Sequence, residues 1–168
     1  HLDFVRAQLE GDFILIGATL NGSLDMETAR IEEGLFFQEV KGNITSFELT
    51  DASAGVLRDD VESWTHVKRY FLKGFRYDRL DGDMRVHERI DWLRGKHDPP
   101  LPGHKEHADT PRQFAPQPYT WLANVLRREG RRQGAAEVRF EREKRLAEVA
   151  YDRVRHERPT GDWRDLRL

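Results

Sequence analysis

The fold is decided by residues 7–37, which read AQLEGDFILIGATLNGSLDMETARIEEGLFF. Small and apolar residues recur in this stretch at a spacing of eleven. The equivalent positions form four columns: Ala7, Ala18 and Ala29; Leu9, Leu20 and Ile31; Phe13, Leu24 and Leu35; and Leu15, Met26 and Phe37. A fixed period over several positions is the signature of a repeat architecture, so we expect a fold built from stacked units.

Small or apolar residues occupy every second position of a row, as in Leu9, Gly11 and Phe13. This is the period of a strand with one buried face. Because eleven is odd, each row needs an extra residue at a bend, which is typical of a β-solenoid. Strands spaced about 8 to 12 residues apart also form antiparallel sandwiches and barrels, which is the alternative. We favour the solenoid, in which Leu9, Leu20 and Ile31 would stack on one another.

Length and composition limit the class of protein. At 168 residues the chain can bury a core without covalent cross-links. It has no cysteine, which rules out disulfides, thiolate zinc sites and a cysteine nucleophile. Its apolar runs are far shorter than the roughly 20 residues that span a bilayer. We therefore expect a soluble, cytoplasmic chain.

Charge is divided unevenly along the chain. Residues 1–63 hold 13 acidic and 4 basic side chains, whereas residues 64–168 hold 17 acidic and 24 basic ones. Such an asymmetry indicates different partners for the two halves. Mutual attraction between the halves explains it equally well, and both interpretations stay open.

We expect the solenoid domain to comprise residues 1–63, where the repeat ends. The next stretch, 64–80, is basic and rich in aromatic residues. Such interleaving can stack on nucleotide bases. We favour a structural role, in which Phe71, Phe75 and Tyr77 plug the end of the solenoid.

Residues 64–168 are expected to form a helical region. Apolar residues at helical spacing predict helices over 83–94, 117–129 and 135–156, the last two joined as a hairpin. Between the first and second helices, residues 96–116 are rich in proline and histidine and predict a loop.

One group of side chains in this loop has the character of a metal site. His97, His104 and His107 lie among acidic residues, and imidazoles with carboxylates are ligands for zinc or nickel. The loop has no apolar scaffold to fix such ligands, so an exposed polar insertion is the alternative.

Two pairs of carboxylates, Asp59 with Asp60 and Asp81 with Asp83, would serve as acid and base if they flanked a cleft. Both lie at predicted turns, where aspartate is favoured because it hydrogen-bonds the backbone, and we favour that role. The chain has no phosphate-binding glycine loop, dinucleotide fingerprint or nucleophile elbow, so we expect no cofactor.

The main surface feature is a basic patch on the predicted hairpin. Its members lie at the turn and along the second helix: Arg127, Arg128, Arg131, Arg132, Arg139, Arg142, Lys144 and Arg145. Such a patch can bind nucleic-acid phosphates or an anionic membrane surface. Glutamates are interspersed at helical spacing, so a salt-bridged, solvated helix is the alternative.

Four further segments carry a family resemblance: residues 17–24 (GATLNGSL), 72–80 (LKGFRYDRL), 92–94 (WLR) and 114–119 (FAPQPY). Together with the repeat and the arginine-rich hairpin, they resemble a group of bacterial proteins with pentapeptide-like repeats that are often labelled membrane-associated oxidoreductases. The resemblance covers nearly the whole chain. It implies a quadrilateral β-helix, a helical C-terminal portion and, in many relatives, transmembrane helices after the hairpin. It supplies no catalytic residues, and no cofactor motif supports the oxidoreductase label.

We therefore expect an α+β chain: a short right-handed β-helix, or pentapeptide-like β-solenoid, followed by an α-helical portion with a helical hairpin. The chain begins directly in a repeat row without the cap that a solenoid needs, so we expect it to be part of a longer protein. We also expect the open first row to pair with a second copy.

The expected function is a non-enzymatic scaffold or protein-interaction module, held at the cytoplasmic face of a membrane in the full-length protein. Its partners would be a protein or a second copy at the open solenoid end, and an anionic membrane surface. One alternative is a nucleic-acid-related binder, acting by DNA mimicry of the acidic repeat or through the basic hairpin. The other is a metal-dependent enzyme using His97, His104 and His107.

Overall fold

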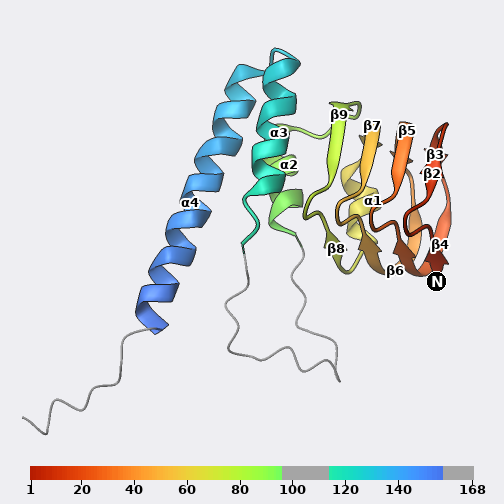
Figure 1. The fold of residues 1–168 in the computed structure, drawn as a ribbon, viewed down its shortest axis with the longest axis horizontal. Coiled ribbons are helices and arrows are strands. Elements are labelled where there is room, and N and C mark those ends of the chain that lie inside the picture. Colours follow the sequence, from red (N-terminus) through yellow and green to blue (C-terminus); the bar gives the residue numbers. More distant parts are fainter. Residues whose placement is uncertain (96–113, 157–168) are drawn as a thin grey trace, which may run out of the picture.

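The computed structural model describes residues 1–95 and 114–156, and it shows a parallel β-solenoid of about four turns followed by helices (Figure 1). The strands form two parallel sheets with the hydrophobic core between them. The first sheet contains β1 (Leu2–Asp3), β4 (Thr19–Asp25), β6 (Lys41–Glu48) and β8 (Tyr70–Phe71). The second contains β2 (Gln8–Leu9), β3 (Phe13–Ile14), β5 (Arg30–Phe37), β7 (Ser53–Asp59) and β9 (Arg76–Leu80).

One complete coil of the solenoid takes 22 or 23 residues. Leu2 pairs with Leu24, and Leu24 pairs with Phe47. The eleven-residue row is therefore half a coil, and consecutive rows lie on opposite sheets. The solenoid is confirmed, and the antiparallel alternative is wrong because every ladder is parallel.

The expected stacking of consecutive rows is wrong. Leu9 pairs with Ile31, two rows away, and Leu20 pairs with Gly42. The physical reason is that each row ends in a bend that carries the chain across to the other sheet. A row therefore meets its equivalent only after a second bend.

The bend expected at the end of each row is confirmed. Residues with φ between 54° and 69° recur every eleven positions: Arg6, Gly17, Thr28 and Glu39. The next residue commonly closes a tight turn, as Ala29 does by donating its N–H to the carbonyl of Met26 (3.0 Å). This left-handed backbone disfavours an L-residue by about 1–2 kcal/mol, so the turn and ladder hydrogen bonds must offset strain at the non-glycine bends.

A short helix, α1 (Val61–Thr65), follows the third-coil strand β7. Asp60 caps it, with Oδ1 accepting from the Ser63 N–H (2.7 Å). The same two residues complete the neighbouring bend: Asp60 Oδ2 accepts from the Glu39 N–H (2.8 Å), and Ser63 Oγ accepts from the Val40 N–H (3.0 Å). Side chains of the helix start thus satisfy backbone donors of the preceding coil.

We expected the solenoid to end at residue 63, and this is wrong. β8 pairs with β6 and β9 pairs with β7, so the sheets continue to Leu80. The reason is that strand alternation resumes after α1, with Phe75 and Tyr77 buried and Arg76 exposed between them. Phe71 was predicted to plug the end of the solenoid. It is 43% exposed, so this prediction is wrong for Phe71.

The three predicted helices are confirmed, with small shifts at their ends: α2 (Val86–Arg94), α3 (Gln117–Arg128) and α4 (Arg132–His156). α2 covers the last coil, where Trp92 contacts Trp64 with ring centroids 5.4 Å apart. α3 lies beside β9, and α4 packs against α3 as the second arm of the hairpin (Figure 1).

Side chains from α3 and its C-cap cover the outer edge of β9 and the bend before it. An uncovered strand edge exposes backbone donors and acceptors that invite pairing. The hydrogen bonds join Gly74 N–H to Gln117 Oε1 (2.9 Å), Leu80 N–H to Glu129 Oε1 (2.9 Å), Trp121 Nε1 to the Tyr77 carbonyl (2.8 Å) and Arg128 Nη2 to the Asp78 carbonyl (3.2 Å). The helix thereby closes this edge of the solenoid.

Candidate functional site

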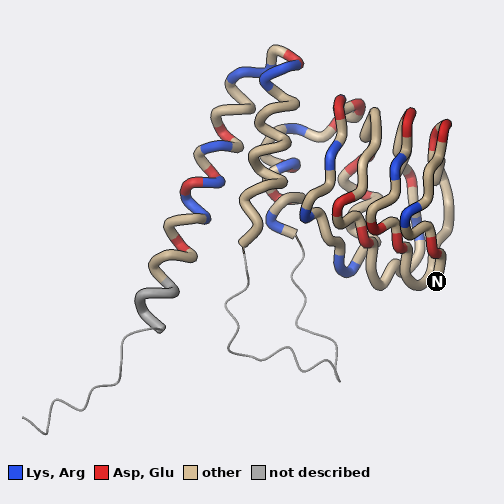
Figure 2. The backbone as a smooth tube through the Cα atoms, in the orientation of Figure 1, with Lys and Arg blue, Asp and Glu red and all other residues tan. Residues whose placement is uncertain are grey.

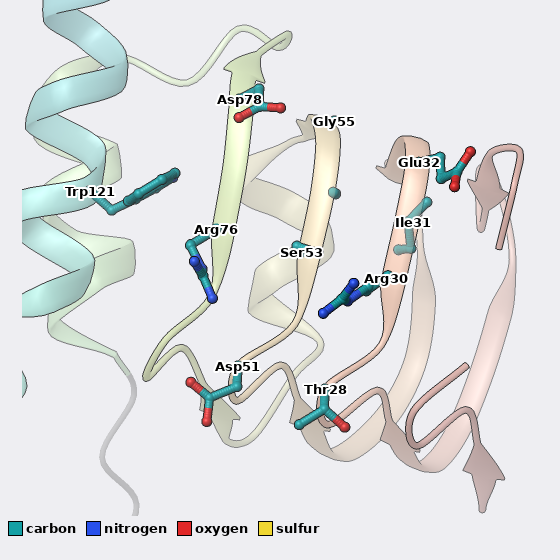
Figure 3. A pocket seen from close by; sticks show the side chains of 11 residues that line it. Thr28, Arg30, Ile31, Glu32, Asp51, Ser53, Gly55, Arg76, Asp78 and Trp121 are labelled. Atoms are coloured by element: carbon teal, nitrogen blue, oxygen red, sulfur yellow. The ribbon is translucent and has the colours of Figure 1, made fainter. Parts of the chain in front are cut away.

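A groove of about 590 Å³ lies on the outer face of β5, β7 and β9, beside α3 (Figure 3). Its floor is a row of outward-facing residues from three successive coils, Arg30, Ser53 and Arg76, which are aligned by the ladder. Trp121 of α3 forms the wall next to β9. The groove is shaped by the solenoid and its helical cover together.

The groove is deepest at its middle strand, β7, because the outward-facing residues there are small. Ser53 lies between the two arginines, and Gly55 follows it on the same face. A Cβ at Gly55 would lie 2.5 Å from the carbonyl oxygen of Glu33, which bulges toward it. Packing between coils therefore requires glycine here, and it leaves this part of the floor flat.

The open end of the solenoid is the second candidate surface. Leu2 and Leu24 occupy the same ladder position one coil apart, yet they are 43% and 2% exposed. Phe4 and Phe13 pack edge to face at this end, with centroids 4.9 Å apart, and both stay half-buried. The first coil thus exposes apolar side chains that the next coil buries completely.

A smaller cavity of about 340 Å³ lies between β8 and the three helices of the cap. Tyr119, Val149 and Arg145 contribute to its wall. Burial raises the pKa of the Tyr119 hydroxyl above its ordinary value. The tyrosine therefore stays neutral across the physiological pH range.

The predicted metal ligands His97, His104 and His107 lie outside the described residues. Within residues 1–95 and 114–156, no group of three His, Asp or Glu side chains is placed to hold a metal ion. The metal site therefore stays a prediction about the 96–116 loop.

The predicted carboxylate pairs have structural partners. Asp59 is fully buried and forms an ion pair with Arg89 of α2, while Asp60 caps α1. Asp81 forms an ion pair with Arg58 on β7. No partner is shown for the exposed Asp83 in the described part. Asp59 thus binds a side chain of α2, whereas Asp60 binds the backbone of α1.

The eight residues of the predicted basic patch lie on the hairpin, and Figure 2 shows cations at its turn and along α4. Several are already engaged. Arg145 pairs with Glu148, three positions on, at 2.8 Å, and Arg142 pairs with the adjacent Glu143 at 2.5 Å. At the turn, Arg131 has only a distant carboxylate, 3.8 Å away. Residues that are exposed with no partner in the described part are Arg127, Arg132 and Lys144.

The groove arginines were not predicted as site residues. Arg30 and Arg76 are 46 positions apart in the sequence. This separation is not a multiple of eleven, but it equals two coils of 23 residues in the ladder. A signal was present in the sequence: both follow a bend and the small or apolar residue that closes it. Only the observed pairing shows that they share a face.

No protein-family model, curated protein or solved structure matches the chain. The resemblance to proteins with pentapeptide-like repeats therefore stays a prediction carried by the sequence motifs. In the described ranges, no helix is both long enough and apolar enough to cross a lipid bilayer.

Proposed function

We propose that this chain is a non-enzymatic interaction module, a rigid scaffold that self-associates through the first coil of its solenoid. The observation that carries the proposal is the contrast between Leu2 and Leu24, 43% and 2% exposed at one ladder position. Covering the end of the solenoid would bury such side chains, and apolar burial stabilises by roughly 25 cal/mol per Å².

Among the residues that the structure describes, another first coil offers a matching surface. A partner must offer both apolar side chains and unpaired backbone groups along β1, β2 and β3. At the other end of the solenoid, α3 already covers β9. Pairing between two first coils is isologous, so it stops at a dimer and does not grow into a filament.

The rigidity of the proposed scaffold is supported by how buried polar groups are used. Asp59 and Arg89 attach α2 to the solenoid, and Ser63 completes a bend. Glu141, 7% exposed, accepts two hydrogen bonds from Arg94 and ties α4 to α2. Each of these groups fixes one element against another, which is what a rigid scaffold requires.

Sedimentation velocity over a range of protein concentrations tests the self-association. We expect a concentration-dependent monomer–dimer equilibrium. Leu2→Asp should weaken dimerisation roughly tenfold or more, because it places an unpaired charge in an apolar contact. The variant should fold normally, since Leu2 lies on the outermost strand and is 43% exposed.

The matched control is Val61→Asp. Val61 is also 43% exposed, but it lies on α1, away from the first coil. It introduces the same charge and should leave the equilibrium unchanged. A wild-type chain that is monomeric at every concentration, or two variants that behave alike, would overturn the proposal.

The exposed cations at the hairpin turn favour a second candidate function, attachment to an anionic membrane face. Arg127 and Arg132 are exposed and without a carboxylate partner in the described part, and each basic residue near such a surface contributes about 1 kcal/mol. We expect sedimentation with phosphatidylserine-containing vesicles and not with pure phosphatidylcholine. A duplex DNA gel shift separates this from phosphate binding to nucleic acid.

Charge reversal locates the membrane contact. Arg127→Glu with Arg132→Glu should reduce vesicle binding roughly tenfold or more. The same change of charge on the solenoid, Lys68→Glu with Arg79→Glu, is the control and should have little effect. Equal losses in both double variants, or binding that ignores lipid charge, would remove this candidate.

A further inference from the structure

The groove beside α3 contains two arginines whose side chains have no partner among the described residues. Arg30 and Arg76 are exposed, and neither guanidinium group forms a hydrogen bond or ion pair within the part of the chain that the structure describes. Arg58 and Arg89, by contrast, form ion pairs with Asp81 and Asp59. The groove therefore has two guanidinium groups available for a ligand.

Their spacing suits a compact anion. Arg30 and Arg76 flank Ser53 in one ladder, and neighbouring strands are about 4.8 Å apart, so the two arginine backbones are roughly 10 Å apart. Both side chains are long enough to converge above Ser53, whose hydroxyl adds a donor. Guanidinium groups match the oxygen geometry of phosphate and carboxylate. Figure 3 shows all three residues on the same side of the sheet.

Acidic residues on both sides limit the size of that anion. Asp51 precedes Ser53 by two positions, and Glu32 and Asp78 line the other side of the groove. All three are exposed. Their charges repel a polyanion that extends beyond the arginines, so a nucleic-acid strand or an anionic membrane is disfavoured.

The wall of the groove is aromatic. The indole of Trp121 is held in place by its hydrogen bond to the Tyr77 carbonyl (2.8 Å), and Arg128 lies over its ring, 5.9 Å from the centroid. Trp121 is only half-buried and lines the groove. A rigid, half-exposed indole is a good surface for a flat apolar group.

We propose that this groove binds a small molecule in which a compact oxyanion, a phosphate monoester or a carboxylate, is joined to a flat apolar group. The oxyanion lies between Arg30 and Arg76 above Ser53. The apolar group lies against Trp121. Glu32, Asp51 and Asp78 exclude longer polyanions.

Nuclear magnetic resonance titration tests this with three probes: phenyl phosphate, benzoate and inorganic phosphate. We expect phenyl phosphate or benzoate to shift the Nε–H signals of Arg30 and Arg76 and the indole N–H of Trp121 in a saturable way. The more effective of the two identifies the oxyanion. Inorganic phosphate should shift the arginine signals and leave the indole nearly unchanged. No saturable shift with any probe would overturn the proposal.

Variants separate a site from general charge attraction. Arg30→Gln with Arg76→Gln should weaken binding roughly tenfold or more, with an unchanged circular dichroism spectrum because both residues are exposed. Lys68→Gln with Arg79→Gln removes the same charge elsewhere and should retain wild-type affinity. Equal losses in the two double variants would contradict a site at this groove.

The acidic border has its own test. A short single-stranded oligonucleotide should bind the wild-type groove more weakly than phenyl phosphate does. Asp51→Asn with Asp78→Asn should strengthen oligonucleotide binding, because the repelling charges are gone and the arginines remain. Wild-type protein that prefers the oligonucleotide would overturn the proposed selectivity for compact anions.

Discussion

At the scale of single residues, the joint between solenoid and cap depends on a buried charge. Asp59 is fully buried and accepts hydrogen bonds from Arg89 on α2 and from the indole of Trp64 (2.7 Å). Burial by itself would lower the pKa of Arg89, but the charge and hydrogen bonds of Asp59 raise it, so the arginine stays protonated. The pair holds α2 in place.

Removing one partner of this pair should be strongly destabilising. In Arg89→Met, Asp59 keeps the hydrogen bond from Trp64 but is left as an uncompensated buried charge. Breaking a buried pair in this way typically costs about 3–5 kcal/mol. Urea unfolding followed by circular dichroism measures the change.

The double variant Asp59→Asn with Arg89→Met is the control. The asparagine retains an acceptor for the Trp64 indole and carries no charge, so part of the lost stability should return. A loss below about 1 kcal/mol in Arg89→Met would show that Asp59 reaches solvent or another partner once the arginine is gone.

Sequence patterns favoured a turn for Asp59, with an acid–base pair with Asp60 as the alternative. The turn is wrong for Asp59, which is the last residue of β7. Its partner Arg89 lies 30 positions away on another element. Arg89 lies beside Ile90 in a helix whose apolar face was predicted. The sequence around a charged residue on that face does not indicate which residue it pairs with. Local periodicity therefore could not supply this contact.

At the scale of elements, α3 takes the place of a fifth coil. Its side chains provide the donors and acceptors that another strand would bring to β9, including Glu129 Oε1 for the N–H of Leu80 (2.9 Å) and Gln117 Oε1 for that of Gly74 (2.9 Å). The cap works because it satisfies backbone groups without offering a new strand edge.

Hydrogen exchange of single amides tests this role. In Glu129→Ala, the Leu80 amide should exchange roughly fivefold faster, since it loses a hydrogen bond worth about 1 kcal/mol. Glu129→Gln keeps an acceptor in place and should preserve protection. The Asp81 amide, which donates to the Leu57 carbonyl (2.9 Å), is an internal control and should not change. Equal protection of Leu80 in all three proteins would contradict the edge-covering role.

The helix itself was predictable, but its function as a cover was not. Leu122 and Leu126 lie on an apolar stripe at helical spacing, which predicts the element and its buried face. Gln117 and Glu129 are ordinary choices for a polar helix face, and Trp121 fits the apolar stripe. Their hydrogen bonds to the edge of β9 depend on where β9 lies in the fold, which no local sequence pattern predicts.

At the scale of the whole molecule, the eleven-residue period predicted a solenoid and the bends that punctuate it. The period alone did not determine the coil length. The alternation of inward-facing apolar residues is the same whether consecutive rows lie on opposite sheets or stack directly on one another. Parallel pairing resolves this in favour of 22 or 23 residues per coil. The groove was missed for the same reason, since Arg30, Ser53 and Arg76 align only in that register.

The same scale shows a molecule with two unlike ends. One end of the solenoid is closed by α2 and α3, and the other presents the apolar interior of the first coil around Leu2 and Phe13. This polarity is the basis for proposing a closed dimer. It also leaves the groove free, because the groove lies on the outer face of β5, β7 and β9 and not on the exposed edge of the first coil.

Hydrogen exchange measured by mass spectrometry at low and high protein concentration would locate the self-association interface. We expect protection to rise with concentration in peptides from residues 1–16 and to stay constant in peptides from α3 and α4. Protection that is independent of concentration throughout the chain, or that rises at the helical hairpin instead, would contradict self-association through the first coil.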